Sequence, residues 1–374
     1  MLTRETLTTA KRIVVKVGTS TLTHATGKLN LLRIEKLVRE LSDLANQGKD
    51  IILVTSGAVG VGVDRLGLKE RPKNIPEKQA AAAIGQGILM HTYEKIFGEY
   101  GQIVAQVLLT REDSVNRSRY ANSRNTLLTL LGMNVIPIIN ENDAVAVDEL
   151  KIGDNDTLSA MVASIVDADL LIILSDVEGL YTDNPLTNPE AKFISGVSDI
   201  TPEIESLAGG PGTVRGTGGM YTKIQAAKIA VNSGVAMIIA SGARDGIVRS
   251  VVSGEEVGTM FFSKENRLQT RKRWLAFGAR IVGAVTVDKG AEKALLKGSS
   301  LLAAGIRAVD GKFDHGNTIR ILTAEGREIA RGLANYSAED CRKIMGAHTC
   351  DIAGILGYKP YDEVIHRDNM VLLV

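Results

Sequence analysis

The sequence has 374 residues, 44% of them hydrophobic, and balances 44 Lys and Arg against 43 Asp and Glu. This length predicts two domains, or one large domain with a smaller module. The charge balance gives no sign of a nucleic-acid or membrane partner, and no stretch approaches the ~20 apolar residues of a membrane helix. The two cysteines, Cys341 and Cys350, lack the spacing of a zinc site and the density of a disulfide scaffold, so we expect reduced thiols and a cytoplasmic location.

Short apolar, β-branched runs alternate with amphipathic segments from residue 12 to about residue 240. The expected strands cover residues 12–17, 50–55, 103–109, 134–139, 169–175 and 235–240. The expected helices cover residues 31–47, 78–97, 123–131, 155–168 and 222–234. Because the strands are continuously apolar rather than alternating, both of their faces should be covered. This predicts a three-layer α/β/α sandwich with a mostly parallel central sheet.

The pattern changes twice along the rest of the chain. Residues 144–154 alternate apolar and polar side chains, which predicts a β-hairpin before a helix that begins near Asp154. After residue 264 a basic segment precedes short alternating strands with Gly-rich turns, which predict a small β-barrel. The expected divisions are a first domain at 1–264, a basic linker at 265–280, the barrel at 281–359 and a C-terminal tail at 360–374.

Polar loops follow the expected strands, at the edge where parallel sheets bind ligands. Lys16 lies inside an otherwise apolar strand, so it either forms a structural ion pair or projects toward an anion held by residues 18–20. Residues 55–62, with the sequence TSGAVGVG, have the small side chains of an anion cradle at a helix start. Their spacing fits neither the dinucleotide-binding glycine motif nor the P-loop.

Further polar groups follow the later strands. Residues 139–144, INENDA, and the pair Ser175 and Asp176 could each be turn chemistry alone. Residues 215–227 read as a glycine loop that opens a helix, with Lys223 in its first turn. A lysine there opposes the helix dipole, so its position makes sense if an anion shares the site.

Residues 154–156, Asp-Asn-Asp, crowd two carboxylates and an amide at an expected helix start. Capping needs one of them, so Asp154 is expected to cap, and the second carboxylate faces water or pairs with a cation elsewhere. No Ser/His/Asp or Cys/His constellation is visible, and the five histidines have no ligand spacing.

In this order, the motifs resemble the glutamate-phosphorylating branch of the amino acid kinase family, in its bacterial form with a C-terminal PUA domain. The motifs that carry the resemblance are VVKVGTS, VTSGAV, INENDAVAVDELKIGDNDTLSA, LSDVEGLYTDNP, GTGGMYTK and VDKGAEKALLKGSSLLAAGI. The resemblance covers nearly the whole chain and implies a kinase domain at 1–264 and a PUA domain at 281–359. The implied reaction is ATP-dependent phosphorylation of the side-chain carboxylate of L-glutamate to glutamyl 5-phosphate, the first step of proline synthesis.

The resemblance also implies roles for individual residues. Ser56, Asp143 and Asn155 are expected to bind glutamate. Lys16 and Lys223 are expected to contact the phosphates, with Asp156 holding both lysines, and these three form the expected catalytic set. The expected ATP-binding residues are Lys16, Ser175, Asp176, Thr217, Gly218, Gly219, Met220, Tyr221, Thr222 and Lys223. No metal ligand is assigned, and Ser175 stands where relatives often have Thr.

These residue types suit the implied chemistry. A carboxylate with a pKa of about 4.3 is already ionised at neutral pH, so it needs no general base. The barrier is its repulsion from the γ-phosphate, roughly 1 kcal/mol per unit charge pair at ~4 Å in water and about 4 kcal/mol at an effective dielectric of 20. Two lysines, together with a magnesium ion bound with ATP, offset that repulsion.

The resemblance further implies feedback inhibition by proline, a homodimer or homotetramer, and handover of the product to glutamyl phosphate reductase. One alternative is a family member that acts on aspartate, acetylglutamate or carbamate. A second places the function in the barrel, as an RNA-binding module extended by the basic linker. The barrel lacks a strong basic excess and aromatic stacking platforms, so RNA is not the expected partner.

Overall fold

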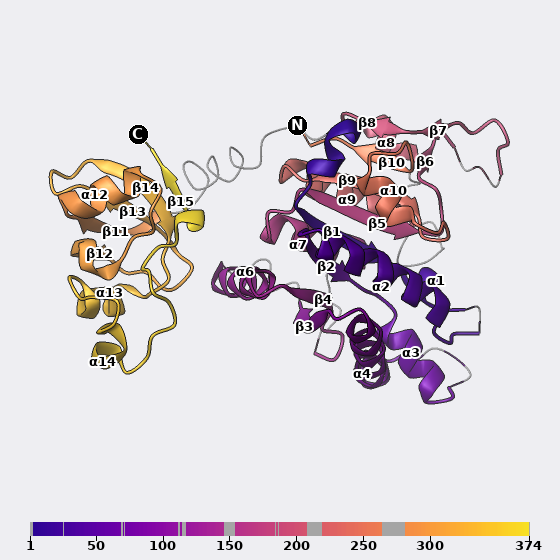
Figure 1. The fold of residues 1–374 in the computed structure, drawn as a ribbon, viewed down its shortest axis with the longest axis horizontal. Coiled ribbons are helices and arrows are strands. Elements are labelled where there is room, and N and C mark those ends of the chain that lie inside the picture. The colour runs from indigo at the N-terminus through magenta and orange to yellow at the C-terminus, as the bar shows by residue number, and fades with distance from the viewer. Residues whose placement is uncertain are drawn as a thin grey trace. The chain divides into compact units, whose positions relative to one another are not determined.

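The computed structural model describes residues 3–24, 26–68, 70, 72–110, 113, 117–145, 154–183, 185, 187–207, 219–263 and 281–373. The chain forms two compact units, the larger mostly before residue 264 and the smaller mostly after residue 280, and each is described by itself (Figure 1). Most of the expected hairpin, residues 146–153, and the whole basic linker lie outside the described residues. Within those residues, no helix is both long and apolar enough to cross a membrane.

An eight-stranded sheet forms the centre of the larger unit, in the order β3-β4-β2-β1-β5-β9-β10-β8. Its strands are β1 (Arg12–Val17), β2 (Asp50–Val54), β3 (Ile103–Leu109), β4 (Val135–Glu141), β5 (Leu170–Ser175), β8 (Gly196–Val197), β9 (Ala236–Ser241) and β10 (Thr259–Phe261). All neighbours from β3 to β9 run parallel, while β10 runs antiparallel to β9. The mostly parallel sheet is therefore confirmed, and all six predicted strands belong to it.

Helices cover both faces of this sheet (Figure 1). The helices are η1 (Arg4–Thr9), α1 (Thr19–Leu22), α2 (Leu31–Asn46), α3 (Ala58–Arg65), α4 (Ile75–Glu99), α6 (Arg117–Gly132), α7 (Asn155–Ile165), α8 (Pro202–Leu207), α9 (Met220–Asn232) and α10 (Ile247–Val252). Ile13, Val15 and Val17 of β1 pack into one core with side chains of α2 and α4. Because side chains alternate along a strand, Lys16 faces the opposite layer, where α7 and α9 pack together.

Four short strands before residue 264 were not predicted from the sequence. The segment after β5 forms a small hairpin of β6 (Leu180–Tyr181) and β7 (Phe193–Ile194), and β8 and β10 complete one edge of the large sheet. Each of these strands has only two or three residues. A periodic pattern needs about four or more residues to be recognised, so these strands depend on the tertiary structure.

Helices α3 and α4 pack at backbone contact, through two glycines. A Cβ atom added at Gly62 would lie 1.8 Å from the carbonyl oxygen of Ala81, and one at Gly85 would lie 1.8 Å from that of Ala58. No side chain fits at either position, because real Cβ atoms do not approach backbone so closely. This contact fixes the start of α3, and with it the loop that follows β2.

The smaller unit is built on a five-stranded mixed sheet in the order β12-β11-β13-β14-β15. Its elements are β11 (Ile281–Val287), α12 (Lys289–Leu296), η3 (Ala303–Gly305), β12 (Ile306–Gly311), β13 (Thr318–Leu322), β14 (Glu328–Leu333), α13 (Ala338–Ile344), α14 (Ile352–Leu356), η4 (Arg367–Asn369) and β15 (Met370–Leu372). The expected small β domain is thus present. Residues 370–372, assigned from the sequence to a tail, pair with β14, so the end of the chain is part of this sheet.

Candidate active site

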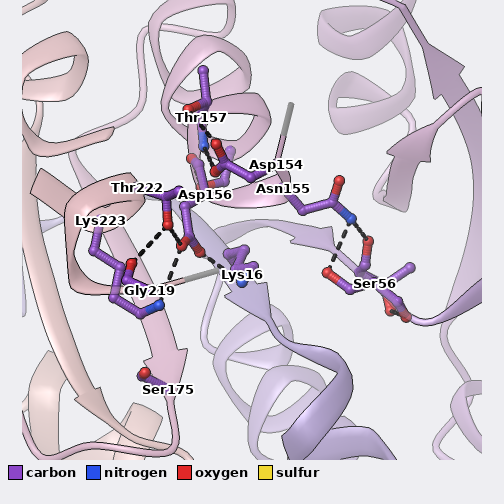
Figure 2. A network of polar contacts seen from close by, with 12 residues as sticks. Lys16, Ser56, Asp154, Asn155, Asp156, Thr157, Ser175, Gly219, Thr222 and Lys223 are labelled. Carbon is purple, nitrogen blue, oxygen red and sulfur yellow. Dashed lines mark hydrogen bonds and ion pairs between the residues drawn. The ribbon is translucent and has the colours of Figure 1, made fainter. Parts of the chain in front are cut away.

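The N-terminus of α7 lies beside the carboxyl ends of β1 and β2, where Asp156 contacts Lys16 and Asn155 contacts Thr55. Asp154 caps this helix as predicted, because its Oδ1 accepts from Thr157 N at 2.8 Å and its Oδ2 from the Thr157 hydroxyl at 3.0 Å. Successive helical residues point about 100° apart. Asn155 and Asp156 therefore enter two different clusters of polar side chains, as Figure 2 shows.

The first cluster joins two buried lysines through one carboxylate. Lys16 Nζ lies 2.6 Å from Asp156 Oδ1, and Lys223 Nζ lies 3.2 Å from Asp156 Oδ2. The three residues come from β1, α7 and α9 and are at most 7% exposed. The Thr222 hydroxyl lies 2.8 Å from both Asp156 Oδ2 and the Gly219 carbonyl oxygen. The structure thus brings together the three residues expected to be catalytic.

The electrostatics of this cluster favour an anionic ligand. Burial alone would raise the pKa of Asp156, but the ammonium groups of Lys16 and Lys223, with hydrogen bonds from Lys16 and Thr222, hold that pKa below its ordinary value. Asp156 is therefore ionised at neutral pH. Two lysines thus share the Asp156 carboxylate in a buried region, where charge interactions are stronger than in water.

The second cluster surrounds the side-chain amide of Asn155. Its Nδ2 lies 2.5 Å from the carbonyl oxygen of Thr55, 3.0 Å from Ser56 Oγ and 2.9 Å from Asn140 Oδ1. Asn140 Nδ2 in turn donates to Gln86 Oε1 at 2.7 Å. Two of the residues expected to bind glutamate, Ser56 and Asn155, are therefore in direct contact.

The third residue expected to bind glutamate, Asp143, lies in the turn that follows β4. Ser175 ends β5, and its hydroxyl donates to Asp176 Oδ1 at 3.0 Å. The carbonyl oxygen of Ser175 also accepts from Gly242 N at 2.8 Å, which joins the ends of β5 and β9. These residues lie at the same carboxyl edge of the sheet.

The expected nucleotide-binding run is described only in part. Thr217 and Gly218 lie outside the described residues. Gly219 is the N-cap of α9, and Met220 and Tyr221 begin the helix, with Tyr221 39% exposed. Lys223 follows one turn later and points back to Asp156, as Figure 2 shows.

Gln86 and Asn140 were not predicted from the sequence to belong to the site. Asn140 lay in a polar loop and could have been included on that signal. Gln86 gave none, because it is one polar residue within a largely apolar helical segment. Across the described ranges, no group of three or more His, Cys, Asp or Glu side chains could hold a metal ion.

Comparisons with known proteins show the family of the chain. The model of the amino acid kinase family matches residues 11–241, and that of the PUA domain matches residues 283–356. A protein of Moorella thermoacetica named glutamate 5-kinase is 57% identical over 371 residues, 99% of this chain and 98% of its own length. Glutamate 5-kinases of Caldanaerobacter subterraneus subsp. tengcongensis and Carboxydothermus hydrogenoformans are 58% and 54% identical, over 97% and 99% of this chain and 98% and 100% of their own lengths. The chain therefore belongs to the amino acid kinase family, among full-length relatives that are named glutamate 5-kinase.

Proposed function

We propose that this chain transfers the γ-phosphoryl group of ATP to the side-chain carboxylate of L-glutamate, giving glutamyl 5-phosphate and ADP. A carboxylate oxygen forms the new bond to phosphorus while the bond from phosphorus to the ADP oxygen breaks. The names of the full-length relatives support the choice of glutamate and ATP.

The observation that carries the proposal is the buried cluster of Lys16, Asp156 and Lys223. The two ammonium groups come from different layers of the fold, yet one carboxylate holds both. Phosphoryl transfer needs mainly positioning and stabilisation of charge on the phosphate oxygens. In the proposed mechanism both lysines contact the phosphates, and Asp156 fixes their spacing without taking up a proton.

The substrates bind on either side of α7's first turn in this proposal. Ser56, Asp143 and Asn155 hold the α-amino and α-carboxylate groups of glutamate. The run from Thr217 to Lys223, together with Ser175 and Asp176, holds ATP. Both substrates then approach the lysine cluster from the carboxyl edge of the sheet, where parallel sheets bind ligands.

Magnesium enters the proposed reaction as part of the Mg²⁺·ATP substrate. The described residues offer no dedicated group of metal-binding side chains, and the carboxylate of Asp156 is already engaged by two lysines. Magnesium commonly binds through substrate phosphates with few protein ligands, so this arrangement suits it. The ion supplies additional positive charge at the phosphates.

The proposal extends to regulation and assembly. Proline, an amino acid with the same α-amino and α-carboxylate groups, inhibits by competing for the glutamate site. The chain forms a homodimer or homotetramer and hands its reactive acyl phosphate to glutamyl phosphate reductase. A cytoplasmic location is supported by two cysteines that are both free thiols.

The test is a substrate panel. The purified protein is incubated with ATP, magnesium, hydroxylamine and one acid at a time, because hydroxylamine traps acyl phosphates as hydroxamates. Glutamate should give hydroxamate, while aspartate, acetylglutamate and carbamate should give little. Activity with another acid and none with glutamate would overturn the proposal.

A further inference from the structure

The donor and acceptor ends of the Asn155 amide are fixed by their neighbours. The atom 2.5 Å from the Thr55 backbone oxygen must be the nitrogen, because a backbone carbonyl can only accept a hydrogen bond. Ser56 Oγ and Asn140 Oδ1 lie within 3.0 Å of the same nitrogen. The two hydrogens of Nδ2 are therefore both used within the protein.

This arrangement leaves Asn155 Oδ1 without a hydrogen-bond partner among the described residues, and it is not one of the fully buried unpartnered atoms. Figure 2 shows it directed away from Ser56, on the opposite side of the amide from Nδ2. An oxygen of this kind is an acceptor only, so it suits a positively charged donor such as an α-ammonium group. The Ser56 hydroxyl, which accepts from Asn155, keeps its own hydrogen to donate to a carboxylate.

Asn140 holds Asn155 in this orientation, and Gln86 holds Asn140. Asn140 is 2% exposed, and its Oδ1 accepts from both Asn155 Nδ2 and Glu141 N at 2.9 Å. Its Nδ2 donates to Gln86 Oε1 at 2.7 Å. Turning the Asn140 amide over would place its donor against the two donors of Asn155 and Glu141. Gln86 satisfies the nearly buried Nδ2 of Asn140 and so stabilises the side chain in its place.

We propose that Gln86, acting through Asn140, is a positioning residue that fixes the Asn155 amide so that its Oδ1 receives the α-ammonium group of the amino acid substrate. The inference rests on the proposed function, and it adds a residue from α4, far in sequence from the other members of the site. Gln86 does not touch the substrate. It acts by keeping the Asn140 side chain against Asn155, so that the Asn155 amide stays in position for the ammonium group.

The experiment compares Gln86→Met, which keeps the side-chain length and removes the acceptor, with Gln86→Glu, which keeps an acceptor for Asn140 Nδ2. Gln86→Met should raise the KM for glutamate about 3- to 10-fold, the range expected for one neutral hydrogen bond. The KM for ATP should stay within about twofold. Gln86→Glu should recover at least part of the loss. Gln102→Met is the matched control, because it removes a similar hydrogen bond, from Gln102 Nε2 to Asn46 Oδ1 at 2.8 Å, on an exposed surface.

A substrate analogue separates positioning from general damage. Glutarate has the two carboxylates of glutamate but lacks the ammonium group, so its inhibition constant should be the same for wild type and Gln86→Met. An equal loss of affinity for glutamate and glutarate, or an unchanged KM for glutamate in Gln86→Met, would overturn the inference. If the wild-type protein does not phosphorylate glutamate at all, the proposed function fails instead, so the two failures are distinguishable.

Discussion

Replacing Asp156 by Asn tests whether one carboxylate organises both lysines. The change keeps the size of the side chain and removes its charge, so both buried ammonium groups lose the carboxylate that contacts them. At an effective dielectric of 20, the Coulomb attraction is roughly 6 kcal/mol at the 2.6 Å of the Lys16 contact and roughly 5 kcal/mol at the 3.2 Å of the Lys223 contact. Desolvation of the ions offsets much of this sum, and removing one partner of a buried pair typically costs about 3–5 kcal/mol.

Asp156→Asn should therefore lower the free energy of unfolding by about 3–5 kcal/mol, measured by urea titration, because both lysines stay buried but lose the Asp156 carboxylate. It should also lower kcat in the hydroxamate assay on the order of 10²- to 10³-fold, since the lysines lose the group that sets their spacing. Asp245→Asn is the control, because Asp245 forms a much more exposed ion pair with Lys36, which should be worth about 1 kcal/mol or less. Normal kcat and normal stability in Asp156→Asn would refute the reasoning.

Three further outcomes are expected. Lys223→Ala should lower kcat on the order of 10²- to 10³-fold, and a kcat near that of wild type would exclude a role at the transferring phosphate. The folded state holds the pKa of Asp156 below its ordinary value of about 4. The stability that this carboxylate provides is therefore complete above about pH 4 and is lost as the pH falls through the lowered pKa. In urea titrations at decreasing pH, the difference in unfolding free energy between wild type and Asp156→Asn should shrink accordingly. Gly85→Ala should destabilise the protein by at least about 1–3 kcal/mol, because the new Cβ would collide with the Ala58 carbonyl. Gly87→Ala on the same helix is the control: its Cβ meets no atom within 4 Å, so it should stabilise the protein by up to about 1 kcal/mol. Equal thermal unfolding of the two variants would contradict this packing.

The secondary structure around the site followed from local patterns. The run 12–17 is apolar apart from its basic residues and β-branched, and it forms β1, because an apolar strand of that length is stable only when covered on both sides. Asp154 caps α7 because the interaction spans three residues and needs no distant partner. The short strands β6, β7, β8 and β10 were missed because each is stabilised by its neighbours in the sheet rather than by its own sequence.

The order of polar motifs along the chain indicated the family, and the resemblance implied that Asp156 holds Lys16 and Lys223, but no local pattern places these residues together. Residues 16, 156 and 223 lie on β1, α7 and α9, and only the parallel strand order and the packing of α7 on α9 bring them together. The place of Gln86 in the site also depends on tertiary packing. Nothing in its local sequence distinguishes it, and its contact with Asn140 exists because α4 packs beside the carboxyl end of β4. Local sequence determined the elements and their caps, since those depend on neighbouring residues, while the tertiary structure decided which buried charges and amides meet, since that depends on how distant elements pack.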